Sequence, residues 1–207
     1  MKTYSIIVIL FFFTSVILAQ ENNAFTDARD AKTYKTIQIG TQTFMAENLC
    51  FKPGKGTYHA YEDEQKNIQI YGYLYDWETA NKVCPMGWHL PSDYEWKTLE
   101  LYLGMPQEEA DLSRKRGEKL GAKIKSQKGW YDNGNGDNSS NFNALPAGAV
   151  LFYDQSFQFL TEKAYFWTST PADIDFWART LSYDDTYFGR SQFNKSNCMS
   201  VRCLKNE

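Results

Sequence analysis

The stretch VCPMGWHLPSDYEW, residues 83–96, carries the strongest local folding signals in the chain. Ser92 precedes Glu95 by three residues, which is the spacing of a capping box, where each side chain accepts a hydrogen bond from the other residue's backbone amide. Pro91 keeps the residue before it out of helical geometry. The stretch therefore predicts an extended segment that becomes a helix directly after Ser92.

The residues that follow give this helix an apolar side. Trp96, Leu99 and Leu103 recur at helical spacing, and Gly104 with Pro106 provides a stop signal. We expect the helix to pack its apolar side on the core of a domain.

Residues 1–19 have the pattern of a secretory signal peptide, with one lysine, a long apolar run and a small residue before the cleavage point. The run is shorter than the roughly 20 residues that span a bilayer, and no later stretch is apolar enough. We therefore expect no membrane span after cleavage, and a location in the periplasm, on the cell surface or outside the cell. Residues 20–33 are expected to be a polar tether, and residues 34–207 one domain.

The charge of the chain excludes one class of partner. The formal net charge is −3 and no block of basic residues occurs, so nucleic acid and anionic membrane surfaces are not expected to bind. Aromatic residues make up 16% of the chain, so many tyrosine and tryptophan rings are expected at half-buried positions.

Helical patterns come early in the domain and strand patterns come late, which favours an α+β fold. A hairpin with a turn at Gly40 and Thr41 comes first. Helical patterns follow at 71–83, 93–103 and 108–126, and strand patterns at 149–153, 164–170, 176–183 and 198–205. Asp76 is a candidate N-cap for the helix that ends at Pro85.

Four cysteines lie after the predicted signal peptide: Cys50, Cys84, Cys198 and Cys203. An even number in a secreted chain indicates disulfides, and four cysteines allow three pairings. A zinc site is the alternative, but only Cys198 and Cys203 have a spacing near that of metal ligands. Cys84 with His89 would resemble a nucleophile and its base, yet a disulfide-bonded sulfur has no thiolate, so we interpret residues 83–96 as structural.

Several motifs together resemble one family. IGTQTFMAENL, YGYLYDWETA, VCPMGWHLPSDYEWKTLE, NFNALPAG, FWTST and SVRC occur here in the order typical of the Fibrobacter succinogenes major paralogous (FISUMP) domain. The resemblance covers about residues 35–204. It implies an extracytoplasmic bacterial protein.

A looser resemblance concerns the architecture. HLPSDYEW, a tryptophan-bearing strand and a final VRC are similar to the formylglycine-generating-enzyme subgroup of the C-type lectin-like fold. That similarity implies two short helices around mixed antiparallel sheets with long irregular loops. It also implies a disulfide between Cys84 and Cys203, which leaves Cys50 and Cys198 as a second, less certain pair.

Residues 131–141, YDNGNGDNSSN, are a candidate calcium site. Ca²⁺ prefers hard oxygen ligands on a flexible loop, and this loop offers them at Asp132, Asn133, Asn135 and Asp137. The alternative is a tight turn, because Asn-Gly is also a frequent turn dipeptide. No other cofactor is indicated.

Residues 182–190, SYDDTYFGR, join two predicted strands and are the second candidate site. We expect ligand binding by Tyr183, Asp184, Asp185, Tyr187 and Arg190, because loops carry function more often than the scaffold beneath them. A solvated hairpin turn is the alternative. Tyr153 and Tyr165 are further candidates for stacking on a sugar or a peptide.

We interpret the chain as a secreted binding module that recognises a glycan or a protein partner through loops. One alternative is an enzyme of the formylglycine-generating type or a decayed relative, but that activity needs a close reactive cysteine pair, so we do not expect an enzyme. Another is a structural component of the cell envelope. The sequence does not decide the oligomeric state.

Overall fold

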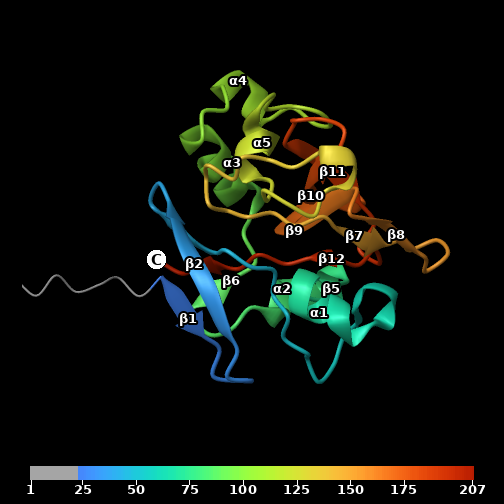
Figure 1. Cartoon of the computed structure of the whole chain (residues 1–207). Helices are drawn as coiled ribbons and strands as arrows, with labels where there is room; N and C mark the ends of the chain where they lie inside the picture. The colour runs from blue at the N-terminus through green and yellow to red at the C-terminus, as the bar shows by residue number, and fades with distance from the viewer. Residues whose placement is uncertain (1–22) are drawn as a thin grey trace, which may run out of the picture.

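The computed structural model describes residues 23–207 and shows an α+β fold of short helices and three sheets (Figure 1). The predicted signal peptide lies outside the described residues. The first sheet has the order β1-β2-β3-β13-β6, with the bounds β1 Ala24–Thr26, β2 Thr33–Ile39, β3 Gln42–Met45, β13 Leu204–Lys205 and β6 Trp88–His89.

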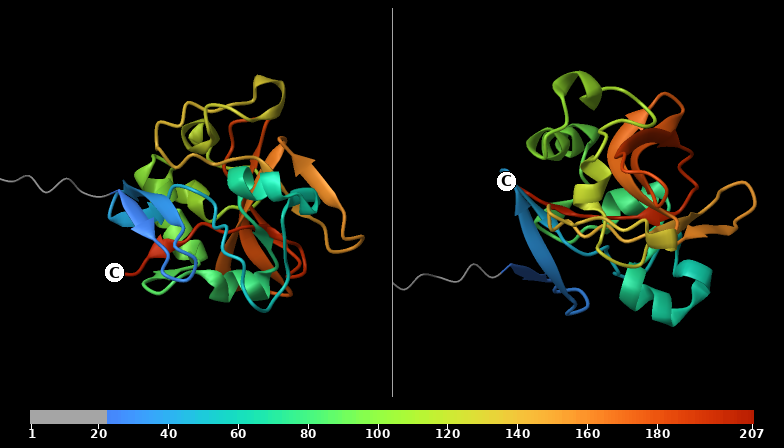
Figure 2. Two further views of the ribbon diagram at one scale, coloured as in Figure 1. Left: turned by 60° about the horizontal axis from the view of Figure 1, so that its bottom comes forward. Right: turned by 45° about the horizontal axis from the view of Figure 1, so that its top comes forward.

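The second sheet has the order β11-β10-β9-β12-β5-β4, and β9 and β12 are its parallel neighbours. Its bounds are β11 Gly189–Phe193, β10 Asp175–Ser182, β9 Lys163–Ala172, β12 Met199–Ser200, β5 Leu74–Tyr75 and β4 Tyr58–His59. The third sheet is a hairpin of β7 and β8, and the loop between its strands projects from the body of the molecule, as Figures 1 and 2 both show. Its strands are β7 Ala147–Val150 and β8 Phe157–Leu160.

The helices lie on both sides of the second sheet, with α3, α4 and α5 on one side and α1 and α2 on the other (Figure 1). The α-helices are α1 Gln65–Tyr71, α2 Trp77–Val83, α3 Asp93–Tyr102, α4 Gln107–Ala110 and α5 Leu120–Ile124. The 3₁₀ turns are η1 Tyr61–Asp63 and η2 Tyr131–Asn133. Within the described part, no helix is long and apolar enough to cross a membrane.

Local signals in the sequence correctly located two helix starts. Ser92 and Glu95 form the predicted capping box of α3, and the Asp76 side chain accepts a hydrogen bond from the Thr79 amide at the start of α2. The predicted hairpin is also present, because β2 and β3 pair antiparallel around Gly40, which has a φ of 63°. These features depend on contacts within a few residues, so the sequence specifies them directly.

Other expectations were wrong in detail. Residues 24–26 belong to the first sheet as β1 instead of a tether. The predicted helix over 71–83 begins only at Trp77, because Gly72 has a φ of 73° and β5 follows it. The predicted helix over 108–126 is split into α4 and α5, and Lys119 between them is left-handed. The looser resemblance implied two short helices, whereas residues 23–207 contain five α-helices. The C-type lectin-like classification is not confirmed.

The disulfide that the looser resemblance implied is present between Cys84 and Cys203, whose Cα atoms lie 5.9 Å apart. It joins the residue after α2 to the residue before β13. The two cysteines are 119 residues apart in the sequence, and closing a loop of that length contributes roughly 4–5 kcal/mol through the unfolded chain. This bond fixes the start of the 83–96 segment to the C-terminal strand.

The predicted second pair, Cys50 with Cys198, is wrong, because both are free thiols. They belong to different parts of the core: Cys198 pairs through its backbone with Val150, while the Cys50 sulfur lies 3.4 Å from the Tyr34 hydroxyl. Burial raises the pKa of Cys198 to about 12. Neither thiol therefore belongs to a reactive cysteine pair.

Side chains of β9, β10 and β11 alternate between two faces of the sheet. On the first, which we call the α3 face, Trp96 of α3 packs against Phe166 with their ring centres 5.9 Å apart. The opposite face, which we call the open face, carries Tyr165 and Trp167, and they join a second cluster that includes Ala80 of α2. The sheet thus separates two apolar clusters.

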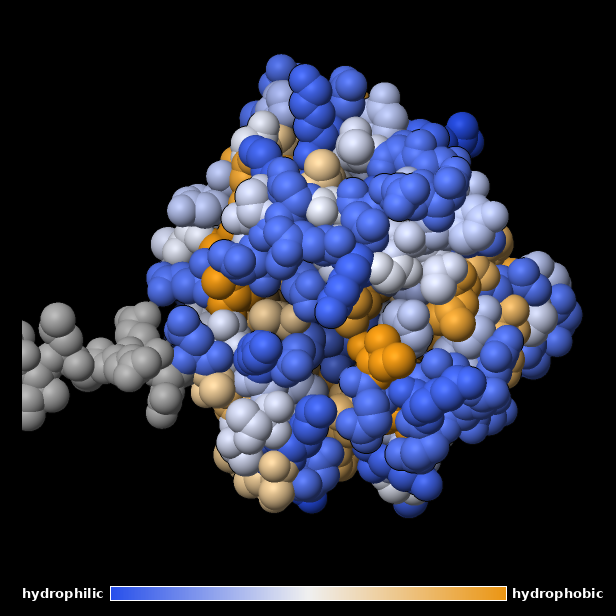
Figure 3. All heavy atoms as spheres, viewed as in Figure 1, coloured by the Kyte–Doolittle hydropathy of each residue, from blue (hydrophilic) through white to orange (hydrophobic). Residues whose placement is uncertain are grey.

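The α3 face also holds a network of buried ion pairs. Glu100 on α3 contacts Arg116 at 2.8 Å and Arg179 on β10, and all three side chains are fully buried. Asp93 at the first turn of α3 contacts both Arg179 and Arg190 at 2.8 Å. The face of the molecule shown in Figure 3, by contrast, is mainly hydrophilic with small separate apolar patches.

Candidate functional site

A pocket on the open face of the sheet brings several of the predicted site residues together. Strand register places Tyr165 of β9 opposite Thr180 of β10, Ser182 opposite Lys163, and Gly189 of β11 next to Thr180. With Phe193 at the other end of β11, these residues form the floor of a cavity of about 410 Å³. We call this cavity the sheet pocket.

The wall of the sheet pocket comes from two loops. Asp184, Asp185 and Tyr187 lie in the connection between β10 and β11, and Lys115 comes from the segment between α4 and α5. Lys115 Nζ lies 2.8 Å from Asp185 Oδ2, although 68% of the lysine side chain is exposed. The hydrogen bond with Asp185 raises the pKa of Lys115. Solvent screens this pair, so it orients the loop more than it stabilises the fold.

Tyr165 provides a polar group at the floor of the pocket. The residue is 7% exposed, and its hydroxyl forms no hydrogen bond with any residue of 23–207. Its ring meets Phe193 edge-on, with ring centres 5.5 Å apart. Burial raises the pKa of Tyr165 well above its usual value, so the hydroxyl keeps its proton and can both donate and accept a hydrogen bond.

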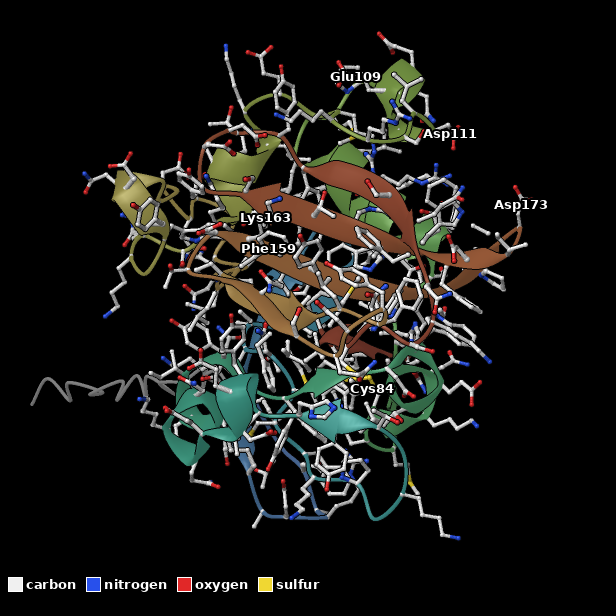
Figure 4. The ribbon with its side chains drawn as sticks, turned by 90° about the vertical axis from the view of Figure 1, so that its right-hand side faces the viewer. Cys84, Glu109, Asp111, Phe159, Lys163 and Asp173 are labelled. Carbon is white, nitrogen blue, oxygen red and sulfur yellow. A yellow bond between two sulfur atoms is a disulfide. The ribbon has the colours of Figure 1, made fainter. Side chains whose placement is uncertain are left out.

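Figure 4 helps to locate the ends of the sheet that holds the pocket. Lys163 and Phe159 lie side by side at one end, with Lys163 Nζ 4.4 Å from the centre of the Phe159 ring. Asp173 marks the turn between β9 and β10 at the other end. The pocket therefore lies at the Lys163 end, next to the loop that follows β10.

Three of the five residues predicted in 182–190 line the sheet pocket: Asp184, Asp185 and Tyr187. Tyr183 does not, because it packs against the core cluster of the α3 face and meets Tyr131 edge-on. The structure does not bring Arg190 into this pocket. Its side chain lies on the α3 face, where it bonds to Asp93 and stacks 3.4 Å from the centre of the Trp177 ring.

Lys115, Lys163, Thr180 and Phe193 complete the pocket but were not predicted. Lys163 and Thr180 could have been found from the sequence. If the two strands are assumed to pair, the alternation of side chains along residues 163–165 and 180–182 places both on the same face as Tyr165. No local signal placed Lys115, because it reaches the pocket from a distant loop. Tyr153, the other predicted stacking residue, is exposed at the β7–β8 turn, away from this cavity.

The predicted calcium loop forms a set of turns. Asn135 Oδ1 accepts a hydrogen bond from the Trp130 amide, and Asp137 Oδ1 accepts one from the Ser139 amide. Asp132 and Asn133 have left-handed backbone in η2. Two of the four side chains thus already serve the loop itself, and no group of three or more His, Cys, Asp or Glu residues in 23–207 is placed to hold a metal. Calcium binding stays a prediction.

The 83–96 stretch is occupied by structural contacts. His89 Nε2 lies 2.8 Å from Glu95 Oε1, and His89 Nδ1 lies 2.7 Å from Asn206 Oδ1. Cys84 is bonded to Cys203 and offers no thiolate. These contacts anchor the chain entry into α3 and the C-terminal strand to each other.

Comparison with known proteins gives one result. A family model described as the Fibrobacter succinogenes major domain matches residues 37–205. No curated protein and no solved structure matches the chain.

Proposed function

The chain belongs to the Fibrobacter succinogenes major domain family, and we propose that it is an extracytoplasmic binding module that recognises a neutral glycan through the sheet pocket. The single observation that carries this proposal is the composition of the pocket. It combines the unpartnered hydroxyl of buried Tyr165 with the hydroxyls of Thr180 and Ser182 and the rings of Tyr187 and Phe193.

These groups match the two sides of a sugar ring. Sugar C–H groups pack on aromatic rings, and sugar hydroxyls exchange hydrogen bonds with protein hydroxyls and carboxylates. The cavity volume of about 410 Å³ lies in the range typical of small-ligand sites. Asp184 and Asp185 supply acceptors at the rim, so a sugar residue in the pocket meets both kinds of partner.

The charge of the lining favours a neutral ligand. Two lysines, Lys115 and Lys163, face two aspartates, Asp184 and Asp185, so the formal charges cancel. The lysines would attract the carboxylate of an acidic sugar, and the aspartates would repel it. A ligand without charge avoids both effects.

The compartment is part of the proposal. A disulfide persists in an oxidising environment, and the Cys84–Cys203 bond supports residence outside the cytoplasm. The signal-peptide pattern of residues 1–19 agrees with this location. There the module would meet extracellular or envelope polysaccharides.

The test is a binding screen on the full mature protein, purified with its disulfide formed. Isothermal titration calorimetry would use neutral hexasaccharides of glucose, xylose, mannose and galactose, with an acidic galacturonic acid hexasaccharide for comparison. We expect at least one neutral chain to bind and the acidic chain to bind more weakly. Tyr187→Ala and Thr180→Val are each expected to weaken binding about tenfold, which is about 1.4 kcal/mol.

Tyr153→Ala is the matched control, because it removes an exposed tyrosine far from the sheet pocket. It should leave affinity unchanged. Absence of binding by every neutral chain, tighter binding of the acidic chain, or full affinity in both pocket variants would overturn the proposal.

A further inference from the structure

A line of aromatic rings leads away from the sheet pocket. Tyr165 in the pocket meets Phe193 edge-on, and Phe193 lies directly opposite Phe176 in the β10–β11 pairing. Phe176 in turn stacks on Trp77 of α2, with ring centres 3.8 Å apart and an interplanar angle of 29°. Two ring pairs, one on β9 and β11 and one on β10 and α2, are thus joined through the strand register of Phe193 with Phe176.

The far end of this line is held rigidly. Trp77 Nε1 donates a hydrogen bond of 2.9 Å to the Thr168 carbonyl oxygen, and the backbone amide of Trp77 donates to the Lys195 carbonyl oxygen. Stacking on Phe176 further restricts rotation of the Trp77 indole. A ligand that packs on this pair loses little of its binding free energy to ordering the protein.

The exposure of these rings differs from that of the neighbouring core. Trp167 and Tyr75 in the same cluster are fully buried, whereas Trp77, Phe176 and Phe193 stay half-buried. Packing alone therefore leaves part of their apolar surface in water. Beside Trp77, Lys195 Nζ lies 2.7 Å from Glu78 Oε1, so these two charges offset each other.

We propose that the sheet pocket is one subsite of a longer groove, and that the Trp77–Phe176 pair is a second subsite for the same neutral glycan chain. This inference rests on the proposed function. Phe193 bridges the two subsites, because it lines the pocket and faces Phe176. The ligand is accordingly an oligosaccharide or polysaccharide, and its affinity depends on how many sugar residues reach the second subsite.

The first experiment needs no variant. Calorimetric titration of the full mature protein would compare the disaccharide, tetrasaccharide and hexasaccharide of the neutral sugar that binds in the screen. The inference predicts that the hexasaccharide binds about tenfold more tightly than the disaccharide. Equal affinity along the series would overturn the second subsite and leave the proposed function intact. Absence of binding by all three would overturn both.

The second experiment tests which residues provide the added affinity of the hexasaccharide. Phe176→Ala should remove the tenfold advantage of the hexasaccharide and leave disaccharide affinity unchanged, whereas Thr180→Val should weaken both. Tyr153→Ala is again the matched control and should change neither. Loss of disaccharide binding in a folded Phe176→Ala protein, or an unchanged advantage of the hexasaccharide, would overturn the assignment.

A measurement on the wild-type protein covers the case in which Phe176→Ala does not fold. The indole N–H of Trp77 can be identified in an NMR spectrum as the signal that Trp77→Phe removes. We expect this signal to shift with the hexasaccharide and to stay in place with the disaccharide. A signal that neither ligand moves would overturn the second subsite.

Discussion

On the α3 face of the β9–β10–β11 sheet, Glu100 and its arginine partners are fully buried, whereas on the open face the Lys115 side chain that pairs with Asp185 is 68% exposed. Both sets have ion-pair distances near 2.8 Å. Burial, and not distance, separates their roles, because a buried charge without its partner is far more costly than an exposed one. The α3 face thus keeps its charges inside the fold, while one end of the open face forms the sheet pocket.

Removing the carboxylate at the centre of the buried network should have the largest effect. Glu100→Ala leaves Arg116 and Arg179 without their shared partner inside the protein. Breaking a buried pair in this way lowers the free energy of unfolding by about 3–5 kcal/mol. Urea denaturation followed by circular dichroism would measure the change. Glu108→Ala, at an exposed position on α4, is the control, and equal stability of the two variants would contradict the comparison.

Acid should lower the stability of the protein through Asp93 on the α3 face. Burial on its own would raise the pKa of Asp93, but the guanidinium groups of Arg190 and Arg179 outweigh it and hold that pKa well below its usual value. The unfolded chain therefore takes up the Asp93 proton first, and the free energy of unfolding should fall as the pH drops below about 4. Denaturation midpoints between pH 7 and pH 2 would show this slope.

The matched variants for the acid experiment are Asp93→Asn and Asp173→Asn. Asp93→Asn should be less stable at pH 7 and should lose less stability on acidification, because its side chain no longer titrates. Asp173→Asn, at the exposed turn between β9 and β10, should follow the wild-type curve. An unchanged acid slope in Asp93→Asn would show that other carboxylates dominate.

The smallest effect is expected on the open face. Lys115→Ala removes the exposed partner of Asp185 and should leave the free energy of unfolding nearly unchanged, because solvent screens this pair. Thermal unfolding of Lys115→Ala and Glu100→Ala under the same conditions would compare the loss of stability on the open face with that on the α3 face. A loss as large as that of Glu100→Ala would mean that the Lys115–Asp185 pair is part of the folding core.

The residues predicted correctly share one property, which is that their partners lie close in sequence or on the same strand. Ser92 with Glu95 and Asp76 with Thr79 are three residues apart. The predicted strand at 198–205 is present as β12 and β13, and between them Val201 and Cys203 join one core cluster while Arg202 contacts the rings of Phe142 and Phe166. The Cys84–Cys203 pairing came from a family resemblance and not from the spacing.

The errors and omissions involve partners from distant segments. Arg190 was assigned to the ligand loop, yet its pairing opposite Arg179 turns it towards Asp93, which is 97 residues away. Cys50 and Cys198 were expected to pair because two cysteines remained, but they lie in different core clusters. Lys115 reaches the sheet pocket from a loop whose position depends on that same packing.

By itself, the sequence determined where α2 and α3 begin, that a hairpin turns at Gly40, and that the loop after β10 carries Asp184, Asp185 and Tyr187. Those features follow from hydrogen bonds over three residues and from the alternation of a strand. Only the tertiary structure decided which side chains of the sheet pack under α3 and which face α2 and the sheet pocket. The reason is that the register of β10 with β9 and β11 assigns every side chain to a face, and a shift by one residue would exchange the two faces.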